Sequence, residues 1–305
     1  MKIGRIVVFW FFTIGMACSP KKQDNSIRLL DNGIYTVRNN VLVFLIDPNL
    51  GARVVSATYD GKEVLLQKRE KLMNWGATFW PSPQSNWNWP PPYAIQFGPY
   101  QGSIQENKLV LQSQTDQKMG LKVKKVFWIN EEKNCLEIEY EITNDTDSVL
   151  QVGPWEIVCV PAVGAKVFFA LGTTPDEVDN TLEFEQNEGI GWFDFDSNNV
   201  DGNRKLFNNS REGWLGHINH DNVLFIKTFE VIPADDLPPG QGNVEVYVSK
   251  PFEYIELESH GKYQLLKPHE TLKYRTTWYL SELPNEISNT SFSTKLVNHI
   301  RSIIQ

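Results

Sequence analysis

The chain has 305 residues, and 41% of them are hydrophobic, which is enough to bury a sizeable core. Acidic residues outnumber lysine and arginine by 37 to 29, so the formal net charge is −8 at pH 7. This acidic balance argues against nucleic acid or an anionic glycan as the main partner. The length fits one large β domain as well as two smaller domains.

Residues 1–18 have the parts of a secretion signal. Lys2 and Arg5 are basic, an apolar stretch follows, and a run of mostly small residues ends in Cys18. The pattern resembles a bacterial lipoprotein signal peptide, in which cleavage before Cys18 and acylation of its thiol leave a membrane anchor. Gly15 stands where leucine is more usual, so cleavage by an ordinary signal peptidase stays open. A transmembrane helix is less favoured, because the apolar stretch is shorter than the roughly 20 residues that a bilayer needs.

The signal predicts where the protein is found. An acylated Cys18 makes it a lipoprotein of the bacterial cell envelope, attached to a membrane on the periplasmic side or at the cell surface. Residues 19–27 are polar and are expected to form a tether that does not fold alone.

Strand signals dominate the remaining chain. The patterns indicate alternating or β-branched runs separated by turns such as Asp60-Gly61. One run alternates apolar residues from Leu136 to Ile142 with glutamates, which indicates a sheet with one face in water. The predicted strands span residues 41–46, 53–59, 64–66, 109–114, 121–128, 136–143, 155–160, 167–170, 213–218, 223–229, 244–248, 254–258 and 272–280.

Helix signals are scarce, and the alternation of strands with helices that a parallel nucleotide-binding sheet requires is absent. One short helix is predicted at the C-terminus, where apolar residues from Phe292 to Ile303 share one face and Ser291 or Ser293 can cap it. Two long stretches, 74–102 and 173–211, carry no regular pattern and are expected to be irregular. Cys135 and Cys159 are expected to be buried free thiols.

The segment 74–93 holds four of the ten tryptophans and five of the seventeen prolines. Indole rings beside short polar side chains suit a surface that stacks on sugar rings and binds hydroxyl groups. Because proline removes backbone donors, we expect a loop and neither a central strand nor a helix. The alternative is a loop that plugs one end of a sheet with its indoles. The tryptophans are Trp75, Trp80, Trp87 and Trp89.

The order of these patterns resembles a known family over nearly the whole chain. Residues 45–66 (LIDPNLGARVVSATYDGKEVLL), Tyr254 to Gly261 and residues 274–280 (YRTTWYL) are similar to the opening and closing parts of the galactose mutarotase-like superfamily. The resemblance implies an all-β fold, a β-supersandwich of antiparallel sheets with a short C-terminal helix, in a single domain over residues 28–305. Residues 80–92 (WPSPQSNWNWPPP) and 154–156 (PWE) are features of an uncharacterised bacterial lipoprotein branch, a domain of unknown function.

The resemblance also implies candidate catalytic residues. In the sugar epimerases of this superfamily a glutamate removes a proton from the anomeric hydroxyl while a histidine protonates the ring oxygen, which avoids a charged intermediate. Glu258 falls on the glutamate position, and Glu256 is the alternate, two residues earlier on the same strand face. A solvated carboxylate on an outer strand face remains the alternative interpretation for both.

The family histidine is missing, because residues 152–157 (VGPWEI) occupy its place. His217 and His220 are the better substitutes for the acid, although a hydrogen-bonding or surface role is favoured for both. His260 is expected in the turn that leaves the Glu258 strand.

A calcium site is a weaker prediction. Asp194, Asp196 and Asn198 offer closely spaced oxygen ligands, but Lys205 stands where a calcium loop has its twelfth-position glutamate. Asx turns explain this run better. We therefore expect no cofactor, with calcium as the open alternative.

Three functions remain open. The first, which we favour because the tryptophan segment is rich and the usual histidine is missing, is an envelope-anchored monomer that binds a neutral mono- or oligosaccharide. The second is an aldose 1-epimerase-like or lyase-like enzyme with Glu258 as base, and the third is a non-catalytic structural or assembly lipoprotein. Besides Glu256 and the four tryptophans, the predicted substrate-binding residues are Arg53, Trp155, Glu156 and Trp214.

Overall fold

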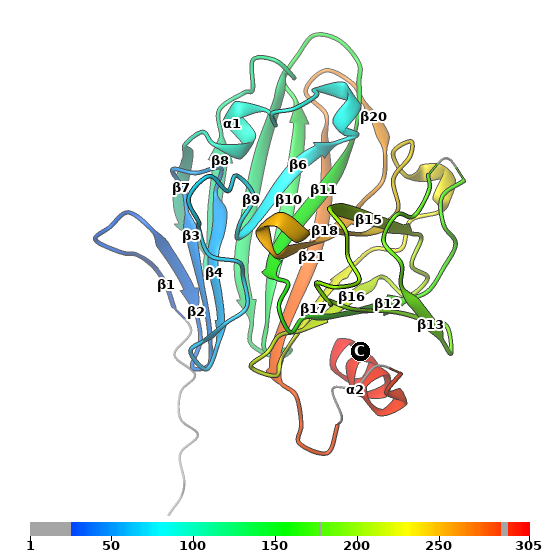
Figure 1. Cartoon of the computed structure of the whole chain (residues 1–305). Coiled ribbons are helices and arrows are strands. Elements are labelled where there is room, and N and C mark those ends of the chain that lie inside the picture. The colour runs from blue at the N-terminus through cyan, green and yellow to red at the C-terminus, as the bar shows by residue number, and fades with distance from the viewer. Residues whose placement is uncertain (1–25, 177, 288–291) are drawn as a thin grey trace, which may run out of the picture.

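The computed structural model describes residues 26–176, 178–287 and 292–305. They form two antiparallel β-sheets and a C-terminal helix (Figure 1). The predicted signal segment and most of the predicted tether lie outside the described residues. Ser26 and Ile27, which we assigned to the tether, belong to the first strand. The described helices are all too short to span a bilayer.

Sheet A carries the site described below. Its main strands, in spatial order, are β1 (Ser26–Leu29), β2 (Tyr35–Arg38), β3 (Leu42–Asp47), β4 (Arg53–Tyr59), β6 (Ala77–Ser82), β11 (Leu150–Pro161), β19 (Tyr254–His260), β18 (Val244–Ser249) and β15 (Asn203–Asn208). Two short strands extend it: β5 (Lys62–Glu63) pairs with β4, and β20 (Gln264–Leu266) pairs with β11.

Sheet B packs against one face of sheet A. Its strands, in spatial order, are β13 (Glu185–Asn187), β14 (Ile190–Asp194), β12 (Lys166–Ala170), β16 (Trp214–Ile218), β17 (Val223–Phe229), β21 (Thr271–Glu282), β10 (Cys135–Asn144), β9 (Leu121–Asn130), β8 (Lys108–Ser113) and β7 (Tyr100–Gln105). The short helices are η1 (Gln84–Asn86), α1 (Tyr93–Gln96), η2 (Ala234–Asp236) and η3 (Lys250–Phe252).

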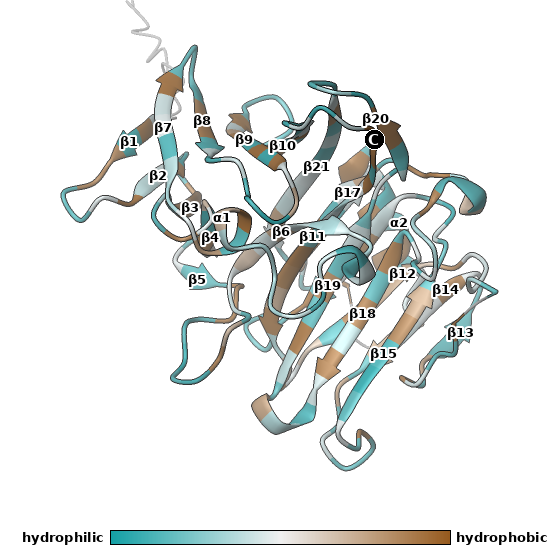
Figure 2. Ribbon diagram, turned by 90° about the horizontal axis from the view of Figure 1, so that it is seen from above, coloured by the Kyte–Doolittle hydropathy of each residue, from teal (hydrophilic) through white to brown (hydrophobic). Residues whose placement is uncertain are grey.

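The period-two alternation of side chains decides what lies between the sheets. In β10, the predicted apolar face from Leu136 to Ile142 is buried in the common core, and Glu141 on the other face pairs with Lys124 and Lys273. Figure 2 shows hydrophilic and hydrophobic residues following one another within single strands such as β18 and β19. The predicted all-β sandwich is thus confirmed.

The predicted C-terminal helix is also confirmed, as α2 (Thr294–Ile304). The Ser293 hydroxyl caps it by accepting a hydrogen bond from the backbone N–H of Leu296 at 3.3 Å. Leu296 and Ile300 are buried against the outer face of sheet B, where they join Trp214 in a second hydrophobic cluster. In Figure 1 this helix, drawn in red, lies beside the end of the molecule formed by β12 and β16.

Several local predictions were wrong. Residues 64–66, predicted as a strand, follow β5 and are not part of a strand. The segment 74–93 contains a strand, β6, although Pro81 lies within it. Pro81 faces Pro154 of β11, and β4 pairs with β6 only at Ala77, so no neighbouring strand needs the N–H that Pro81 lacks. The stretch 173–211 holds β13, β14 and β15. β13 and β15 are short and mostly polar, and β14 is apolar but has only five residues, so none shows a clear alternation. Cys135 and Cys159 are buried and free, as predicted.

Candidate functional site on the outer face of sheet A

A cavity of about 450 Å³ opens on the face of sheet A that points away from sheet B. Ile255 and Leu257 of β19 belong to the core between the sheets, so the alternate residues Glu256 and Glu258 point outward into this cavity. Lys205 of β15 lines the cavity beside them. Trp80, Trp89 and Trp155 form aromatic parts of its lining. One cavity therefore holds the predicted glutamates together with three of the predicted tryptophans.

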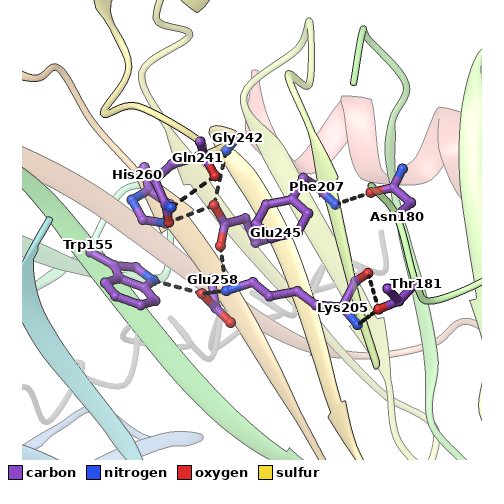
Figure 3. Close-up of polar contacts among 11 residues, drawn as sticks. Trp155, Asn180, Thr181, Lys205, Phe207, Gln241, Gly242, Glu245, Glu258 and His260 are labelled. Atoms are coloured by element: carbon purple, nitrogen blue, oxygen red, sulfur yellow. Dashed lines mark hydrogen bonds and ion pairs between the residues drawn. The ribbon is translucent and has the colours of Figure 1, made fainter. Parts of the chain in front are cut away.

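Figure 3 shows an ionic network whose members Glu258, Lys205 and Trp155 line the floor of the cavity. The Glu258 carboxyl accepts hydrogen bonds from the Trp155 indole at 2.8 Å and from the Lys205 ammonium at 2.9 Å. The same ammonium contacts the Glu245 carboxylate at 2.6 Å, and the other oxygen of Glu245 lies 3.2 Å from His260 Nε2. Lys205 is thus shared by two buried carboxyl groups.

Strand pairing explains why a lysine is needed there. Glu245 and Glu258 lie directly opposite each other on β18 and β19. Like charges at such paired positions destabilise a sheet. The ammonium of Lys205, reaching in from β15, offsets this repulsion, and the rings of Trp155 and Phe207 pack near it, each with its centroid 5.2 Å away.

The surroundings of these groups shift their pKa values in different directions. Burial, together with the charges of Glu245 and Glu256, outweighs Lys205 and raises the pKa of Glu258 to about 8. Burial also acts to raise the pKa of Glu245, but Lys205 and His260 outweigh it and hold that pKa below its ordinary value. Burial lowers the pKa of His260, with Glu245 opposing the shift only in part. Near neutral pH, Glu245 is therefore ionised while much of Glu258 is protonated.

The start of the tryptophan segment is tied to this floor. The side-chain amide of Asn74 donates a hydrogen bond to Glu256 at 2.8 Å. Arg53 donates to the backbone carbonyls of Trp75 at 2.7 Å and Met73 at 3.3 Å. Arg53 therefore holds the segment in place and does not line the cavity.

The four tryptophans of the segment divide between the two roles that the sequence left open. Trp75 and Trp87 are buried in a hydrophobic cluster and do not line the cavity. Trp87 donates its indole N–H to the carbonyl of Pro81 at 2.7 Å. Trp80 is buried but borders the cavity, and Trp89 is exposed at it. The segment thus both packs against the sheet and furnishes the cavity.

Three predicted site residues lie elsewhere. Glu156 points into the core between the sheets, because it alternates with Trp155, and pairs with Lys227 at 2.9 Å. Trp214 packs in the cluster beneath α2, on the outer face of sheet B. His217 is fully buried in sheet B, and burial lowers its pKa to about 3. None of the three lines the cavity, so His217 is not placed to supply a proton beside Glu258.

His220, the other candidate acid, is not placed to supply a proton beside Glu258 either. Its exposed side chain contacts Asp221 at 3.3 Å and does not line the cavity.

His260 is the histidine nearest to the network, and the prediction that it lies in a turn was wrong. It is the last residue of β19 and shares a face with Glu256 and Glu258. Its ring stacks on Trp155 with a centroid distance of 4.9 Å. His260 does not line the cavity, whereas Trp155, on which it stacks, does. Glu245 and Lys205 were also missed. Lys205 comes from β15, far from Glu258 in sequence, and Glu245 lies on the preceding strand β18, where only the pairing register places it opposite Glu258.

Two groups of residues bear on metal binding. Ligand atoms of Glu245, Glu258 and His260 lie within 4.8 Å of one another, but the Lys205 ammonium already contacts both carboxyl groups and supplies a positive charge there. In the predicted calcium run, Asp194 pairs with Lys166. Asp196 accepts hydrogen bonds from the backbone N–H and the side chain of Asn198, at 2.9 and 3.0 Å. The latter geometry is an Asx turn.

The fold is that of a galactose mutarotase-like sandwich. A galactose mutarotase-like protein from Lactobacillus casei superposes with a TM-score of 0.57 at 13% identity, over 82% of this chain and 100% of that chain. One from Clostridium acetobutylicum gives 0.53 at 10% identity, over 85% and 98%. At these identities the likeness establishes the fold alone.

A TPR-domain containing protein from Parabacteroides distasonis gives a TM-score of 0.58 at 14% identity, over 86% of this chain. The match spans only about half of that protein, 49% of its chain. The search of curated proteins found no match. The model of a family described as "Domain of unknown function (DUF4380)" matches residues 34–281, and the chain belongs to this family.

Proposed function

We propose that the cavity on sheet A binds a neutral saccharide. The observation that carries this proposal is the meeting of Glu258, Trp80, Trp155 and Trp89 in one cavity. A sugar presents apolar C–H faces and a ring of hydroxyl groups. Flat indoles can stack on the C–H faces, while carboxyl and amide groups can form hydrogen bonds with the hydroxyl groups.

The charges of the floor favour a neutral ligand. Lys205 offsets Glu245, and Glu258 is protonated to a large extent near neutral pH because its pKa is raised to about 8. Burial also raises the pKa of Glu256. The network therefore leaves little net charge to attract an ionic ligand, whereas its hydrogen-bonding groups remain available to hydroxyls.

The test is a calorimetric screen of neutral mono- and oligosaccharides against the purified protein. For a sugar that binds, Glu258→Ala should weaken affinity about tenfold or more, because a buried hydrogen-bonding group is lost. Glu258→Gln should stay within a few-fold, since the amide keeps the shape and the polar atoms. Trp128→Ala, on sheet B, is the control that should change nothing. An absence of binding across the screen would refute the proposal.

A second candidate function is isomerisation of an aldose at its anomeric carbon, with Glu258 exchanging the proton. The observation that favours it is the raised pKa of Glu258, which suits proton exchange near neutral pH. Among the described residues that line the cavity there is no histidine to act as the acid. Binding is therefore the stronger proposal.

Polarimetry separates the two candidates. An epimerase should accelerate the approach of α-glucose or α-galactose to equilibrium, and Glu258→Gln should return the rate to the spontaneous value while sugar binding remains. Binding without acceleration by the wild-type protein would leave recognition as the function.

We also propose that the protein is held at a membrane of the bacterial cell envelope by an acylated Cys18. The basic, apolar and small-residue parts of residues 1–18 support this proposal. In a bacterial host, metabolic labelling with a palmitate analogue should mark the wild-type protein. Cys18→Ala should lose the label and move to the soluble fraction, and an unchanged membrane fraction would contradict the anchor.

A further inference from the structure

Aromatic side chains lead from the polar floor of the cavity to its mouth, and only the last of them is exposed. Trp155, which donates to Glu258, is 4% exposed. Trp80 contacts it edge to face at 5.0 Å between ring centroids, and is 2% exposed. Trp89 contacts Trp80 at 6.1 Å, again nearly perpendicular, and is 52% exposed. The three indoles form a continuous aromatic track.

Trp89 lies with Asn88 and Pro90 in a short exposed stretch, and the residues on either side of this stretch are buried. Trp87 is fully buried, and its backbone carbonyl accepts a hydrogen bond from Lys118. Pro91 and Pro92 are buried too. The chain therefore presents the indole of Trp89 from a fixed position at the cavity, where half of its surface faces water. Packing of the core does not require an exposed indole there.

Two other large apolar side chains are exposed at the same cavity. Met73 and Phe252 are 39% and 47% exposed, and both belong to its lining. Together with Trp89 they come from three separate segments of the chain. Scattered single apolar residues on a surface need no explanation, but three that converge on one cavity mark a contact site.

The polar groups lie deeper. Glu256 and Glu258 are buried on β19, and Asn74 is bonded to Glu256. The cavity thus combines a floor that can hold one sugar ring by its hydroxyls with an apolar mouth that a single bound ring would leave uncovered. Its volume of about 450 Å³ lies in the range typical of sites for ligands larger than one ring.

Resting on the proposed saccharide function, we infer that the ligand is a saccharide of at least two units. The terminal unit lies on the floor at Glu258, and the next unit stacks at the mouth against Trp89, with Phe252 on the rim. The polar side chains of Gln84 and Asn203 also line the cavity, which suits a second unit that carries hydroxyls better than it suits a purely apolar group.

The test compares each monosaccharide with its disaccharides by calorimetry: glucose with maltose and cellobiose, and galactose with lactose. In the wild-type protein one disaccharide should bind about tenfold or more tightly than its own terminal monosaccharide, as an added ring contact predicts. Trp89→Ala and Phe252→Ala should each lower the disaccharide affinity more than the monosaccharide affinity, so that this ratio falls toward one. Trp128→Ala should leave both affinities as they are.

The outcomes separate the two proposals. Equal affinities for the monosaccharide and every disaccharide would overturn the two-unit inference and leave the saccharide function standing. A gain of the same size for octyl β-glucoside as for a disaccharide would also overturn it, because a non-specific apolar mouth would then account for the contact. A wild-type protein that binds none of these probes would overturn both.

Discussion

Glu245 and Glu258 show how neighbouring carboxyl groups acquire different roles. Both are buried, and they face each other across β18 and β19. Lys205 contacts both, but Glu245 also has His260 beside it and accepts the backbone N–H of Gly242 at 3.0 Å. The better-satisfied Glu245 keeps its charge, and the pKa of Glu258 rises to about 8.

This difference predicts how stability depends on pH. A carboxyl whose pKa is higher in the folded state binds more protons when folded, so its contribution to stability falls as pH rises from about 4.5 to about 8. Glu258→Gln removes this titration. The variant should therefore gain stability relative to the wild type between pH 5 and pH 8, by up to about 1.4 kcal/mol for each pH unit across that range.

Urea unfolding at pH 5, 6.5 and 8 measures the effect. Glu139→Gln is a matched control, because Glu139 is partly exposed on the outer face of sheet B and pairs with Arg275. In that control the difference from the wild type should not grow between pH 5 and pH 8. A constant difference for Glu258→Gln as well would mean that Glu258 has an ordinary pKa.

At the scale of the elements, the tryptophan segment both packs against sheet A and exposes one indole at the cavity. Strand β6 places Trp80 opposite Trp155, and the turn that follows buries Trp87 before Trp89 returns to the surface. The alternation of buried and exposed indoles follows from this path of the chain. Trp75 and Trp87 anchor the segment, Trp89 is free to meet a ligand, and the buried Trp80 both packs and lines the cavity.

Because of these two roles, replacing a tryptophan by alanine should change the free energy of unfolding by very different amounts at the two positions. Trp87→Ala should lower the free energy of unfolding by about 3–5 kcal/mol, because it empties a fully buried site and leaves the Pro81 carbonyl without its donor. Trp89→Ala should change it by less than about 0.5 kcal/mol, since the indole is half exposed. Denaturant unfolding of both variants checks this. Similar losses in the two would contradict the division.

At the scale of the whole molecule, the site and the helix occupy opposite faces of the sandwich. The cavity lies on the outer face of sheet A, and α2 covers the outer face of sheet B. Between them lies the common core, which also contains the buried pair of Glu156 and Lys227. Stability and recognition can therefore be perturbed separately.

Substitutions in α2 test this separation. Leu296→Ala and Ile300→Ala each remove a buried side chain and should destabilise the protein by about 2–5 kcal/mol. At a temperature where the variants remain folded, saccharide affinity should stay within a few-fold of the wild type. Thermal unfolding and calorimetric binding measure the two effects. A large loss of affinity in folded variants would show that the helix supports the site across both sheets.

Much of the fold could be predicted because its signals are local. The alternation in β10, the turns between early strands and the apolar face of α2 each lie within a few residues. The same alternation in β19 puts Glu256, Glu258 and His260 on one face, a signal that was present but not followed beyond Glu258. β6 was missed because a proline counted against a strand, and whether that proline is tolerated depends on its neighbours.

By itself, the sequence determined an antiparallel all-β sandwich with a C-terminal helix, and it pointed to Glu258 and the tryptophan segment. Only the tertiary structure decided that Lys205 and Glu245 stand beside Glu258, that Glu156 and His217 do not, and which tryptophans remain exposed. The reason is physical. The face on which a side chain lies follows from a local period of two, whereas its neighbours follow from which strands pair and in which register.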